Sequence, residues 1–532
     1  MTLVRERQHV PDILECLAQL SSDEVPTPPK LANAMLDLLP PEVWRDPKLR
    51  WCDPFSKSGV FLREIAIRLL FKGLVAWEPD LEKRREHIFR NMIFGCGITE
   101  LTAIISRRTV YYSRHAAGEH SVIRFDGDNG NIPFVRAEHD FSGGRCRICG
   151  APEDLERGET RENYAYAFIH GAYPTEEMKD MNFDVIVGNP PYQIGTEGYG
   201  ATASTIYDKF VRRAIELNPR YITMITPSRW FTGGKGLDEY REQMIQDRRL
   251  RSLVDNPKIY DCFPGVKIRG GVSYFLWDRE YSGDCEVSTR INGEIVSTMS
   301  RDLREGKGVL VRDNRAINVI RKVEDSGVTD WVEGACSVTK PFGLTMRSNY
   351  PGSVPQPFEG AIPLIYSDRV AYSRPDEIQR NHEWIDRWKV LLPMASSGDT
   401  QLDETGNIVD VVLGAPIALA PGSACTQTYF IAGMFDTRQE TENYAHYLAT
   451  KFVRFLVLQR KSTQHVTSER FKFVPMLDMS QRWTDEALYE RFGLSQEEIA
   501  YIETTIKPRS VNLSLDSPIP ASHLPGGGKH RP

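Results

Sequence analysis

In the first half of the chain, short continuous apolar runs alternate with segments in which apolar residues recur every three or four positions. This pattern predicts that strands alternate with helices. Short runs of apolar, often β-branched residues have the length and composition of buried strands; they lie at 49–53, 91–98, 183–187 and 221–225. Between these runs, apolar residues recur every three or four positions, the spacing of a helix with one buried face. Strands that alternate with helices build a sheet covered on both sides. The pattern therefore predicts an α/β fold over residues 25–280.

The pattern changes at about residue 281, where short β-like runs and turns begin to follow one another without strand–helix alternation. We therefore expect residues 281–510 to form a separate domain of mixed α+β structure. Residues 113–160 interrupt the first domain as an insertion. Residues 1–24 have the pattern of a short helical lead-in, and residues 511–532 form a tail rich in Pro, Gly and Ser that we expect to be disordered.

Composition narrows the class of protein. The 532 residues suffice for two or three domains with ample cores. No apolar run reaches the roughly 20 residues that span a bilayer, and the N-terminus lacks the apolar stretch of a signal peptide. We therefore expect a cytoplasmic protein without membrane contact. Nine scattered cysteines do not form a secreted disulfide framework, and a net charge of −6 allows at most a local basic face.

The apolar run at 183–187 leads into the most informative motif of the chain, Gly-Asn-Pro-Pro-Tyr. Pro190 and Pro191 lack a backbone N–H and fix their own φ, so the strand ends in a rigid turn that also holds Asn189 extended. The amide oxygen of Asn189 and the carbonyl oxygen of Pro190 are acceptors that can together hold both hydrogens of an NH2 group. The ring of Tyr192 offers a face on which a planar base can stack. The alternative is a plain strand-ending turn.

A second informative turn lies between the apolar run at 49–53 and the helix that follows it, and reads Asp-Pro-Phe-Ser-Lys-Ser-Gly-Val-Phe from Asp53. A turn of small residues between strand and helix offers backbone N–H groups to a ligand, and Gly59 permits close approach. Further upstream, Thr27 stands where it would cap a helix that begins at Pro28. An ordinary strand–helix turn and a capped amphipathic helix are the alternatives.

These motifs together resemble those of the amino-methyltransferases that use S-adenosylmethionine (AdoMet). The turn after Asp53 resembles their AdoMet loop, Asp-Pro-x-x-Gly-x-Gly-x-Phe, and the tetrad resembles their catalytic motif. The order of the motifs is similar to that in DNA adenine-N6 methyltransferases of bacterial restriction–modification systems with a C-terminal target recognition domain. The resemblance implies a Rossmann-like, AdoMet-dependent methyltransferase sheet in residues 25–280 and DNA target recognition in residues 281–510.

The resemblance also assigns roles to residues. Direct methyl transfer to a flipped adenine of double-stranded DNA would use the tetrad Asn189, Pro190, Pro191 and Tyr192. Phe263, at the start of a hairpin predicted at 263–277, would pack on that adenine. The alternative is that its ring packs only in the protein core. The residues that would bind AdoMet are Thr27, Asp53, Pro54, Phe55, Ser56, Lys57, Gly59, Phe61 and Glu100.

Two positions depart from the family. Lys57 replaces the first glycine of the AdoMet loop, and we expect its ammonium group to pair with the carboxylate of the AdoMet methionine moiety. Gly97 replaces an acidic residue that accepts hydrogen bonds from the ribose hydroxyls, and Glu100 is the candidate substitute. These departures leave open a catalytically silent DNA-binding subunit. A methyltransferase that acts on an RNA amine or a protein glutamine amide is the other alternative.

A Cys-x2-Cys knuckle within the insertion has the spacing of half a zinc site. Cys146 and Cys149 form the knuckle, and His139 and His170 are the nearest candidates for the other two ligands of a structural zinc ion. Two reduced cysteines in a loop are the alternative. His170 has a second interpretation as well, because a strand predicted at 164–169 would bring it near the adenine end of AdoMet.

A basic stretch between 451 and 472 is the most telling part of the second domain, with six Lys or Arg residues against one acidic residue. Arg and Gln can pair with base edges, and Lys can hold phosphates. A solvated basic helix face is the alternative. No nuclease centre or helicase-type phosphate loop is evident, so a restriction endonuclease partner would be a separate polypeptide. The residues predicted to contact DNA are Arg460, Lys461, Gln464, Arg470 and Lys472.

Overall fold

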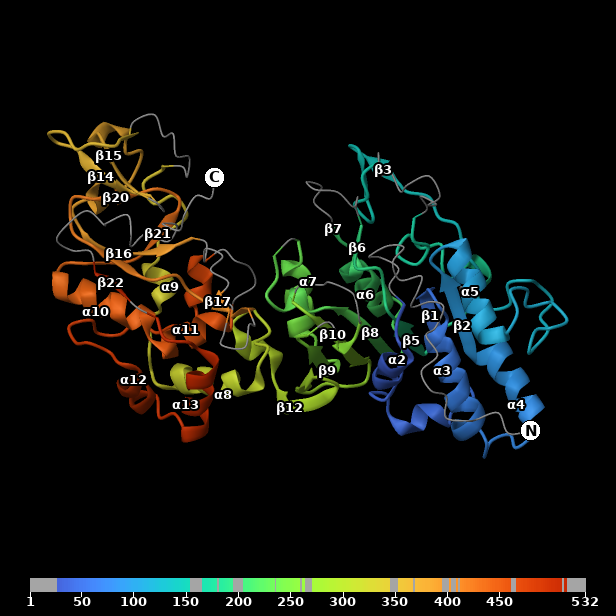
Figure 1. Ribbon diagram of the computed structural model, residues 1–532. Coiled ribbons are helices and arrows are strands. Elements are labelled where there is room, and N and C mark those ends of the chain that lie inside the picture. The colour runs from blue at the N-terminus through green and yellow to red at the C-terminus, as the bar shows by residue number, and fades with distance from the viewer. Residues whose placement is uncertain are drawn as a thin grey trace. The chain divides into compact units, whose positions relative to one another are not determined.

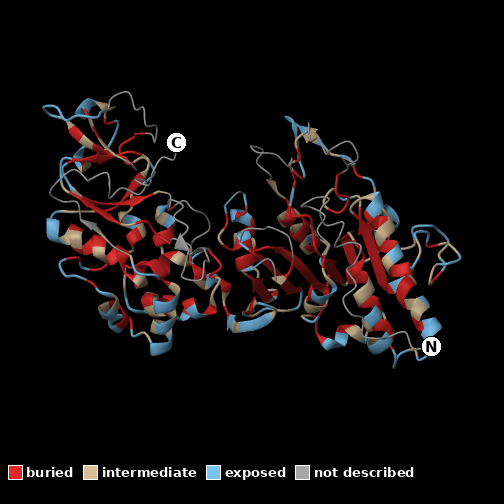
Figure 2. Ribbon diagram, in the orientation of Figure 1, coloured by how far each residue is buried: buried red, intermediate tan, exposed pale blue. Residues whose placement is uncertain are grey.

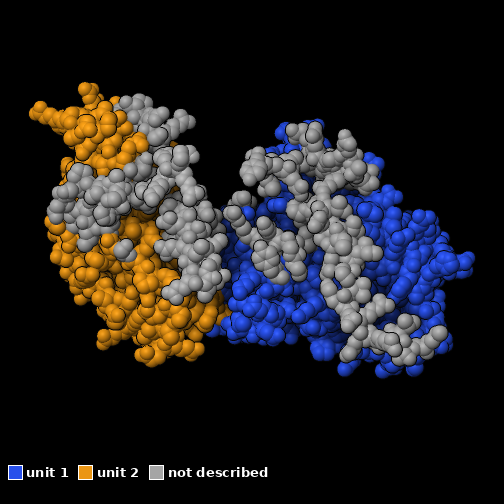
Figure 3. All heavy atoms as spheres, in the orientation of Figure 1, with its two compact units in different colours: residues 1–312 blue, residues 313–532 orange. Residues whose placement is uncertain are grey.

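The computed structural model shows two compact units, residues 1–312 and 313–532 (Figures 1 and 3). The predicted lead-in at 1–24 lies outside the described residues, as does the predicted tail except for residues 511–513. The described residues are 26–153, 165–178, 181–194, 204–234, 236–258, 261–263, 270–344, 353–366, 369–394, 401–402, 408–409, 412–460, 466–509 and 511–513.

The first unit is built on one sheet of eight strands in the order β12-β11-β9-β10-β8-β5-β1-β2. Four neighbouring strands, β2, β1, β5 and β8, run parallel to one another. Beyond them, β10 is antiparallel to both β8 and β9. The strands of this sheet are β1 (Trp51–Ser56), β2 (Ile93–Gly97), β5 (Val185–Gly188), β8 (Tyr221–Pro227), β9 (Leu250–Asn256), β10 (Val272–Asp278), β11 (Cys285–Ile291) and β12 (Glu294–Arg301).

The four parallel strands are the four apolar runs of the sequence, and the predicted α/β class is confirmed. Every residue of β1, β5 and β8 is buried, as expected of parallel strands covered on both faces (Figure 2). Helices α2, α3, α5 and α6 contact these strands. The helices of the first unit are α2 (Pro29–Leu36), α3 (Val60–Arg68), α4 (Leu81–His87), α5 (Glu100–Tyr111), α6 (Tyr207–Glu216) and α7 (Asp238–Gln246), and short two-residue ladders join β3 (Phe141–Ser142) to β4 (Arg145–Cys146) and β6 (Gln193–Ile194) to β7 (Ser204–Thr205).

Residues 131–134, within the predicted insertion at 113–160, lie beside β2. Gly97 and Phe134 form a parallel bridge there. The strand predicted at 164–169 is therefore wrong: of its described residues only Ala165 forms a bridge, and a turn follows. The run is apolar because it packs into the core of the first unit, and burial alone does not distinguish a strand from a buried turn.

The first unit extends beyond residue 280, where the sequence analysis ends the first domain. Strand β11 pairs in parallel with β9, and β12 pairs antiparallel with β11, so both belong to the same sheet. The unit ends at residue 312. The change of pattern at 281 therefore marks a change from strand–helix alternation to a hairpin at the edge of the sheet, and the boundary between the units follows it.

The second unit is a mixed α+β structure with two four-stranded sheets, β13-β15-β14-β20 and β21-β16-β19-β22, whose apolar side chains share one core. Two short helices, α12 and α13, lie between residues 483 and 507. Among the described residues of the whole chain, no helix has the length and apolar composition to cross a bilayer. The strands of this unit are β13 (Ser353–Val354), β14 (Ile362–Ile365), β15 (Val370–Ser373), β16 (Trp388–Pro393), β17 (Gln401–Leu402), β18 (Ile408–Val409), β19 (Ile417–Leu419), β20 (Ala424–Cys425), β21 (Tyr429–Phe435) and β22 (Asn512–Leu513), and its helices are α8 (Asn314–Asp325), α9 (Val332–Ala335), α10 (Arg438–Ala449), α11 (Lys451–Leu458), α12 (Asp485–Arg491) and α13 (Gln496–Thr505).

Candidate active site

The Asn-Pro-Pro-Tyr tetrad follows β5 directly, at the edge where the parallel strands β1, β5 and β8 end. This carboxyl edge is where open α/β sheets bind their ligands. All four residues of the tetrad are buried. Gly188, the last residue of β5, packs so closely on strand β1 that a Cβ atom there would lie 2.3 Å from a ring carbon of Phe55 and 2.9 Å from Oδ1 of Asp53. The absence of a side chain at Gly188 therefore allows the tetrad and the loop after β1 to come together.

The amide of Asn189 is held by Thr27, a contact that the sequence did not predict. Nδ2 of Asn189 donates a hydrogen bond to Oγ1 of Thr27 at 3.1 Å. The predicted capping role of Thr27 is wrong, because Pro28 occupies the capping position of α2 and no side chain caps that helix. The helix begins one residue later than predicted, at Pro29, so the Thr27 hydroxyl lies too far back to reach its first N–H groups.

A pocket at this edge brings both motifs together. The predicted cofactor residues among its lining are Thr27, Asp53, Phe55, Lys57, Gly59 and Phe61, and the tetrad contributes Asn189. Ser58 and Val60 also line the pocket but were not predicted. Their position inside the loop is the signal that could have identified them, because a loop that presents its backbone to a ligand exposes consecutive residues. Pro54, Ser56 and Glu100 are not among the lining residues.

The loop after β1 is shaped by Gly59 and by a buried carboxyl group. Gly59 has a φ of +74° at the start of α3, and a Cβ atom there would lie 3.0 Å from backbone atoms of Ser106. Burial raises the pKa of Asp53 to about 7, although hydrogen bonds from Ser56 and from the N–H of Phe55, and the charge of Lys57, oppose the rise. The pocket thus contains a carboxyl group that titrates near neutral pH.

Gly97 departs from the family for a reason that the structure makes plain. A Cβ atom at Gly97 would lie 2.5 Å from the backbone nitrogen of Ala103 and 2.6 Å from its Cβ. The start of α5 packs directly onto the end of β2, and an acidic side chain does not fit between them. Glu100, the predicted substitute, is exposed in the first turn of α5, and its role stays a prediction.

An aromatic cluster surrounds Tyr192. Its ring packs edge-on against Tyr207, with 6.4 Å between the ring centroids, and Tyr207 packs in the same way against Tyr240. Burial raises the pKa of Tyr192 well above its ordinary value, so the phenol is neutral. Phe263 is buried in the core of the first unit, and its predicted contact with a flipped base stays a prediction.

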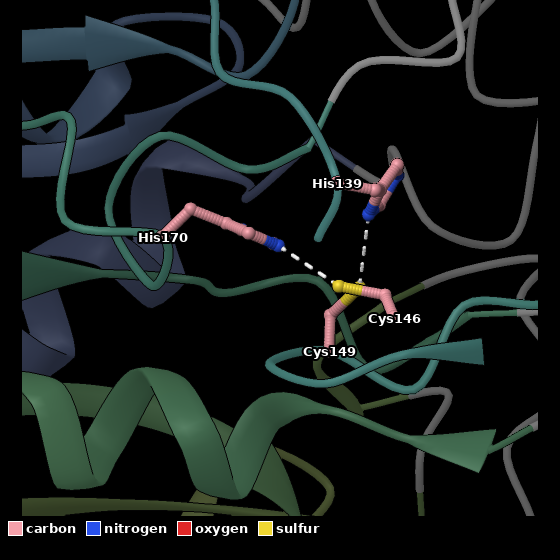
Figure 4. A group of neighbouring side chains, drawn as sticks. All are labelled: His139, Cys146, Cys149 and His170. Carbon is pink, nitrogen blue, oxygen red and sulfur yellow. Dashed lines mark hydrogen bonds between the residues drawn. The ribbon is translucent and has the colours of Figure 1, made fainter. Parts of the chain in front are cut away.

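The predicted metal ligands His139, Cys146, Cys149 and His170 come together in one cluster (Figure 4). Their ligand atoms all lie within 4.8 Å of one another. Sγ of Cys146 is 3.5 Å from Nε2 of His170, and Sγ of Cys149 is 3.3 Å from Nδ1 of His139. A tetrahedral zinc ion with bonds of about 2.0–2.3 Å places its ligand atoms roughly 3.3–3.8 Å apart. The two measured distances and the Cys and His residue types fit the ligand set of such an ion.

Neighbouring backbone groups fix the orientation of these ligands. Nδ1 of His170 lies 2.9 Å from the carbonyl oxygen of Tyr166, so Nδ1 carries the proton and Nε2 faces the cysteines. Burial opposes ionisation of Cys146, but N–H groups of Cys149 and Ile148 and the contact with His170 lower the pKa of its thiol to about 5. His170 thus belongs to the cysteine cluster, whereas the alternative beside adenine depended on a strand that is not formed.

Within its described residues, 451–460 and 466–472, the basic stretch does not form the exposed face that the sequence suggests. Arg460 and Arg470 are only 7% and 3% exposed, and the guanidinium of Arg460 lies 5.3 Å from the ring centroid of Phe473. Their burial argues against direct contacts with DNA. Lys472 is less buried and pairs with Glu333 and Glu469, so its predicted contact stays open. The other two predicted contacts, Lys461 and Gln464, lie outside the described residues.

Residues 452–457 of the basic stretch are buried because α11 packs as an internal helix. Five apolar residues of α11 are buried, as is Arg454, which donates to the carbonyl oxygens of Ala449, Thr450 and Lys507. Arg454 therefore links α11 to neighbouring backbone groups by hydrogen bonds. Counts of Lys and Arg do not distinguish such internal hydrogen bonding from a DNA-binding face.

Known proteins resemble this chain in both sequence and structure. Residues 91–263 match the family described as Eco57I restriction-modification methylase. A protein of Mycoplasma pneumoniae (strain ATCC 29342 / M129 / Subtype 1), named "Uncharacterized adenine-specific methylase", is 34% identical over 350 residues, which cover 60% of this chain and 82% of that protein.

Two solved structures are similar at lower identity. The DrdV–DNA complex is 11% identical with a TM-score of 0.45, and the similarity covers 86% of this chain and 57% of that chain. The type IIG restriction endonuclease BpuSI is 12% identical with a TM-score of 0.38, over 93% of this chain and 66% of that chain. This chain thus spans less than two thirds of the length of either protein.

Proposed function

The chain belongs to the family of adenine-specific methylases, and we propose that it transfers a methyl group from AdoMet to N6 of a flipped adenine in double-stranded DNA. Its α/β sheet is the methyltransferase sheet that the sequence predicts. The observation that carries the proposal is that Asn189 lines the same pocket as the loop after β1. An acceptor for an NH2 group therefore lies beside the residues expected to hold the methyl donor, as direct transfer requires.

The chemistry of the pocket fits AdoMet. The ammonium group of Lys57 can pair with the carboxylate of the methionine moiety, and the carboxylate of Asp53 can accept from ammonium or hydroxyl groups. Phe55 and Phe61 line the same pocket with apolar surface. When bound, AdoMet supplies a methyl group on a positively charged sulfonium.

The tetrad would hold the target nitrogen without a charged base. Oδ1 of Asn189 and the carbonyl oxygen of Pro190 would each accept one hydrogen of the NH2 group, which directs the nitrogen lone pair towards the methyl donor. Both residues are buried and Pro190 has a fixed φ, so the backbone that carries the two acceptors keeps its place. The ring of Tyr192 would stack on the flipped base. Positioning of this kind can supply up to roughly 7–11 kcal/mol of barrier lowering.

The proposal is tested by expression in a host without DNA methylation, followed by single-molecule sequencing for N6-methyladenine. One DNA motif methylated to near completion is the expected result. Asn189→Ala or Tyr192→Ala should abolish the methylation, whereas Asn91→Ala, at an exposed residue that precedes β2, should preserve it. Unchanged turnover in both tetrad variants would overturn the assignment.

Two other functions share part of this chemistry. An RNA amine or a protein glutamine amide is also a planar NH2 group, so incubation with labelled AdoMet and each class of substrate would distinguish them. A catalytically silent DNA-binding subunit would bind no AdoMet. The pocket that joins Lys57, Asp53 and Asn189 favours an active enzyme over the silent subunit.

We further propose that His139, Cys146, Cys149 and His170 bind one structural zinc ion. The proposal is supported by the distances between their ligand atoms and by the second hydrogen bond of His170. Metal analysis of purified protein should give one zinc per chain. Cys146→Ser combined with Cys149→Ser should lose it, while Cys336→Ser, in the second unit, should retain it.

The proposed substrate implies partners. Double-stranded DNA would be one partner, and the second unit would recognise the target sequence. A restriction–modification role would require a separate endonuclease polypeptide, which co-purification from the native host would identify. Action on DNA would place the enzyme in the cytoplasm, as the sequence predicts.

A further inference from the structure

Thr27 and Asn189 are 162 positions apart, yet their side chains share a hydrogen bond inside the first unit. Nδ2 of Asn189 lies 3.1 Å from Oγ1 of Thr27, and the two residues are only 4% and 6% exposed. We propose that Thr27 is a positioning residue that holds the Asn189 amide with its oxygen towards the target NH2 group. This inference rests on the proposed function, because it assigns Thr27 a part in that reaction.

The reaction needs such a residue because an Asn side chain can turn its amide either way. The torsion that turns the amide is broad and roughly two-fold. Pro190 restricts the backbone of Asn189 but not this torsion. In the turned state, the NH2 group of Asn189 would face the NH2 group of the target, and two donors would meet. In the structure the Thr27 hydroxyl instead accepts from Nδ2, so the amide oxygen lies on the other side of the amide, where it can accept from the substrate.

The surroundings of Thr27 keep its hydroxyl in place. Pro28 follows in an extended conformation, with φ −62° and ψ 143°, and Pro29 begins α2, which packs against α3 and β8. The hydroxyl does not cap this helix. Both partners are almost fully buried, so their hydrogen bond is largely shielded from bulk solvent. Thr27 therefore has the burial, rigidity and reach of a positioning residue.

The first test compares Thr27→Val, which keeps the shape but removes the hydroxyl, with Thr27→Ser, which keeps the hydroxyl. We expect Thr27→Val to lower kcat about 10- to 100-fold, and Thr27→Ser to recover most of the rate, since a misplaced hydrogen-bonding group costs this much in related cases. The Kd for AdoMet is measured by calorimetry without DNA for both variants, and the rates are compared at saturating AdoMet, because Thr27 also lines the proposed cofactor pocket. Equal rates for Thr27→Val and wild type would overturn the proposal.

The second test reads the orientation of the amide directly. DNA with hypoxanthine at the target position presents an acceptor where adenine presents its NH2 group. The wild type should bind adenine DNA more tightly than hypoxanthine DNA, and Thr27→Val should reduce this preference at least several-fold, because its amide can turn. If the substitution only loosened the fold, binding of both DNAs would weaken equally. That result would overturn the proposal. A wild type that methylates no DNA would instead reject the proposed function.

Discussion

The ring of Phe168 packs edge-on against the ring of Phe55, with 5.8 Å between their centroids. Phe55 lines the pocket beside Asn189, and Phe168 lies two residues before His170 in the cysteine–histidine cluster. Both rings also contact Phe210. The three packed rings of Phe55, Phe168 and Phe210, here called the aromatic wall, therefore connect the proposed zinc site to the proposed cofactor pocket.

Removal of zinc is expected to weaken AdoMet binding through this wall. Without the ion, His170 is no longer tied to the cysteines, and the turn that carries Phe168 loses its anchor. A coupling of about tenfold in the Kd for AdoMet is expected, within the usual range for linked sites. Calorimetry on zinc-depleted and reconstituted protein, with circular dichroism as the check on folding, measures it. Zinc-depleted protein that binds AdoMet as tightly as the reconstituted protein would contradict the coupling.

The titration of Asp53 predicts that AdoMet binds more tightly as the pH rises through about 7. Burial raises the pKa of this carboxyl to about 7, so it is mostly neutral at about pH 6 and mostly ionised at about pH 7.5. Only the ionised form accepts hydrogen bonds from ammonium or hydroxyl groups with both oxygens. Calorimetry between these pH values keeps the amino group of AdoMet, expected to titrate near pH 8, mostly protonated. Asp53→Asn should bind more weakly at about pH 7.5 and lose the pH dependence.

The same pKa predicts how the stability of the ligand-free protein changes with pH. A carboxyl whose pKa is raised on folding binds more protons in the folded than in the unfolded state, so it stabilises the fold at low pH. The contribution of Asp53 to the free energy of unfolding should therefore fall as the pH rises from about 4 to about 7. Urea unfolding of wild type and Asp53→Asn at several pH values measures this difference. A contribution that grows with pH would contradict the assignment.

Lys57 is expected to supply binding free energy and little else. Replacement by Met keeps most of the apolar stem but removes the charge that would pair with the AdoMet carboxylate. The Kd for AdoMet should rise roughly 10-fold, equal to about 1.4 kcal/mol, within the range for a charge-assisted hydrogen bond. The exposed Lys72, near the end of the helix after the loop, is the matched control. Unchanged affinity in Lys57→Met would place the carboxylate elsewhere.

Local patterns in the sequence predict much of the first unit. The four parallel strands were predictable because each is a short apolar run that is buried on both faces. The tetrad was predictable because proline restricts the backbone through its own ring, independent of the rest of the fold. The cysteine–histidine cluster followed from the short spacing of its knuckle, which leaves few ways to arrange the ligands.

The remaining features depend on contacts between distant parts of the chain. The contact of Thr27 is with Asn189, which follows β5 and lies 162 positions further along the chain. The segment beside β2 is held by backbone hydrogen bonds and carries no strong apolar run that would mark it as a strand. The charges of Arg460 and Arg470 suggest an exposed face, but burial depends on the packing of the whole second unit.

Gly97 stands at the end of β2, where the family has an acidic residue. The variant Gly97→Asp tests whether this glycine reflects a loss of function or a requirement of packing. The new side chain would restore the acidic residue of the family, but its Cβ atom would lie 2.5 Å from the backbone of Ala103. We expect a loss of roughly 2–3 kcal/mol in the free energy of unfolding, because α5 must shift, and no gain in AdoMet affinity. Gly127→Asp is the control, since among the described residues no heavy atom beyond its chain neighbours lies within 4 Å of a Cβ atom at Gly127. Urea unfolding and calorimetry of both variants measure the two quantities. A stable Gly97→Asp variant with tighter AdoMet binding would show that the close packing of α5 does not exclude an acidic residue here.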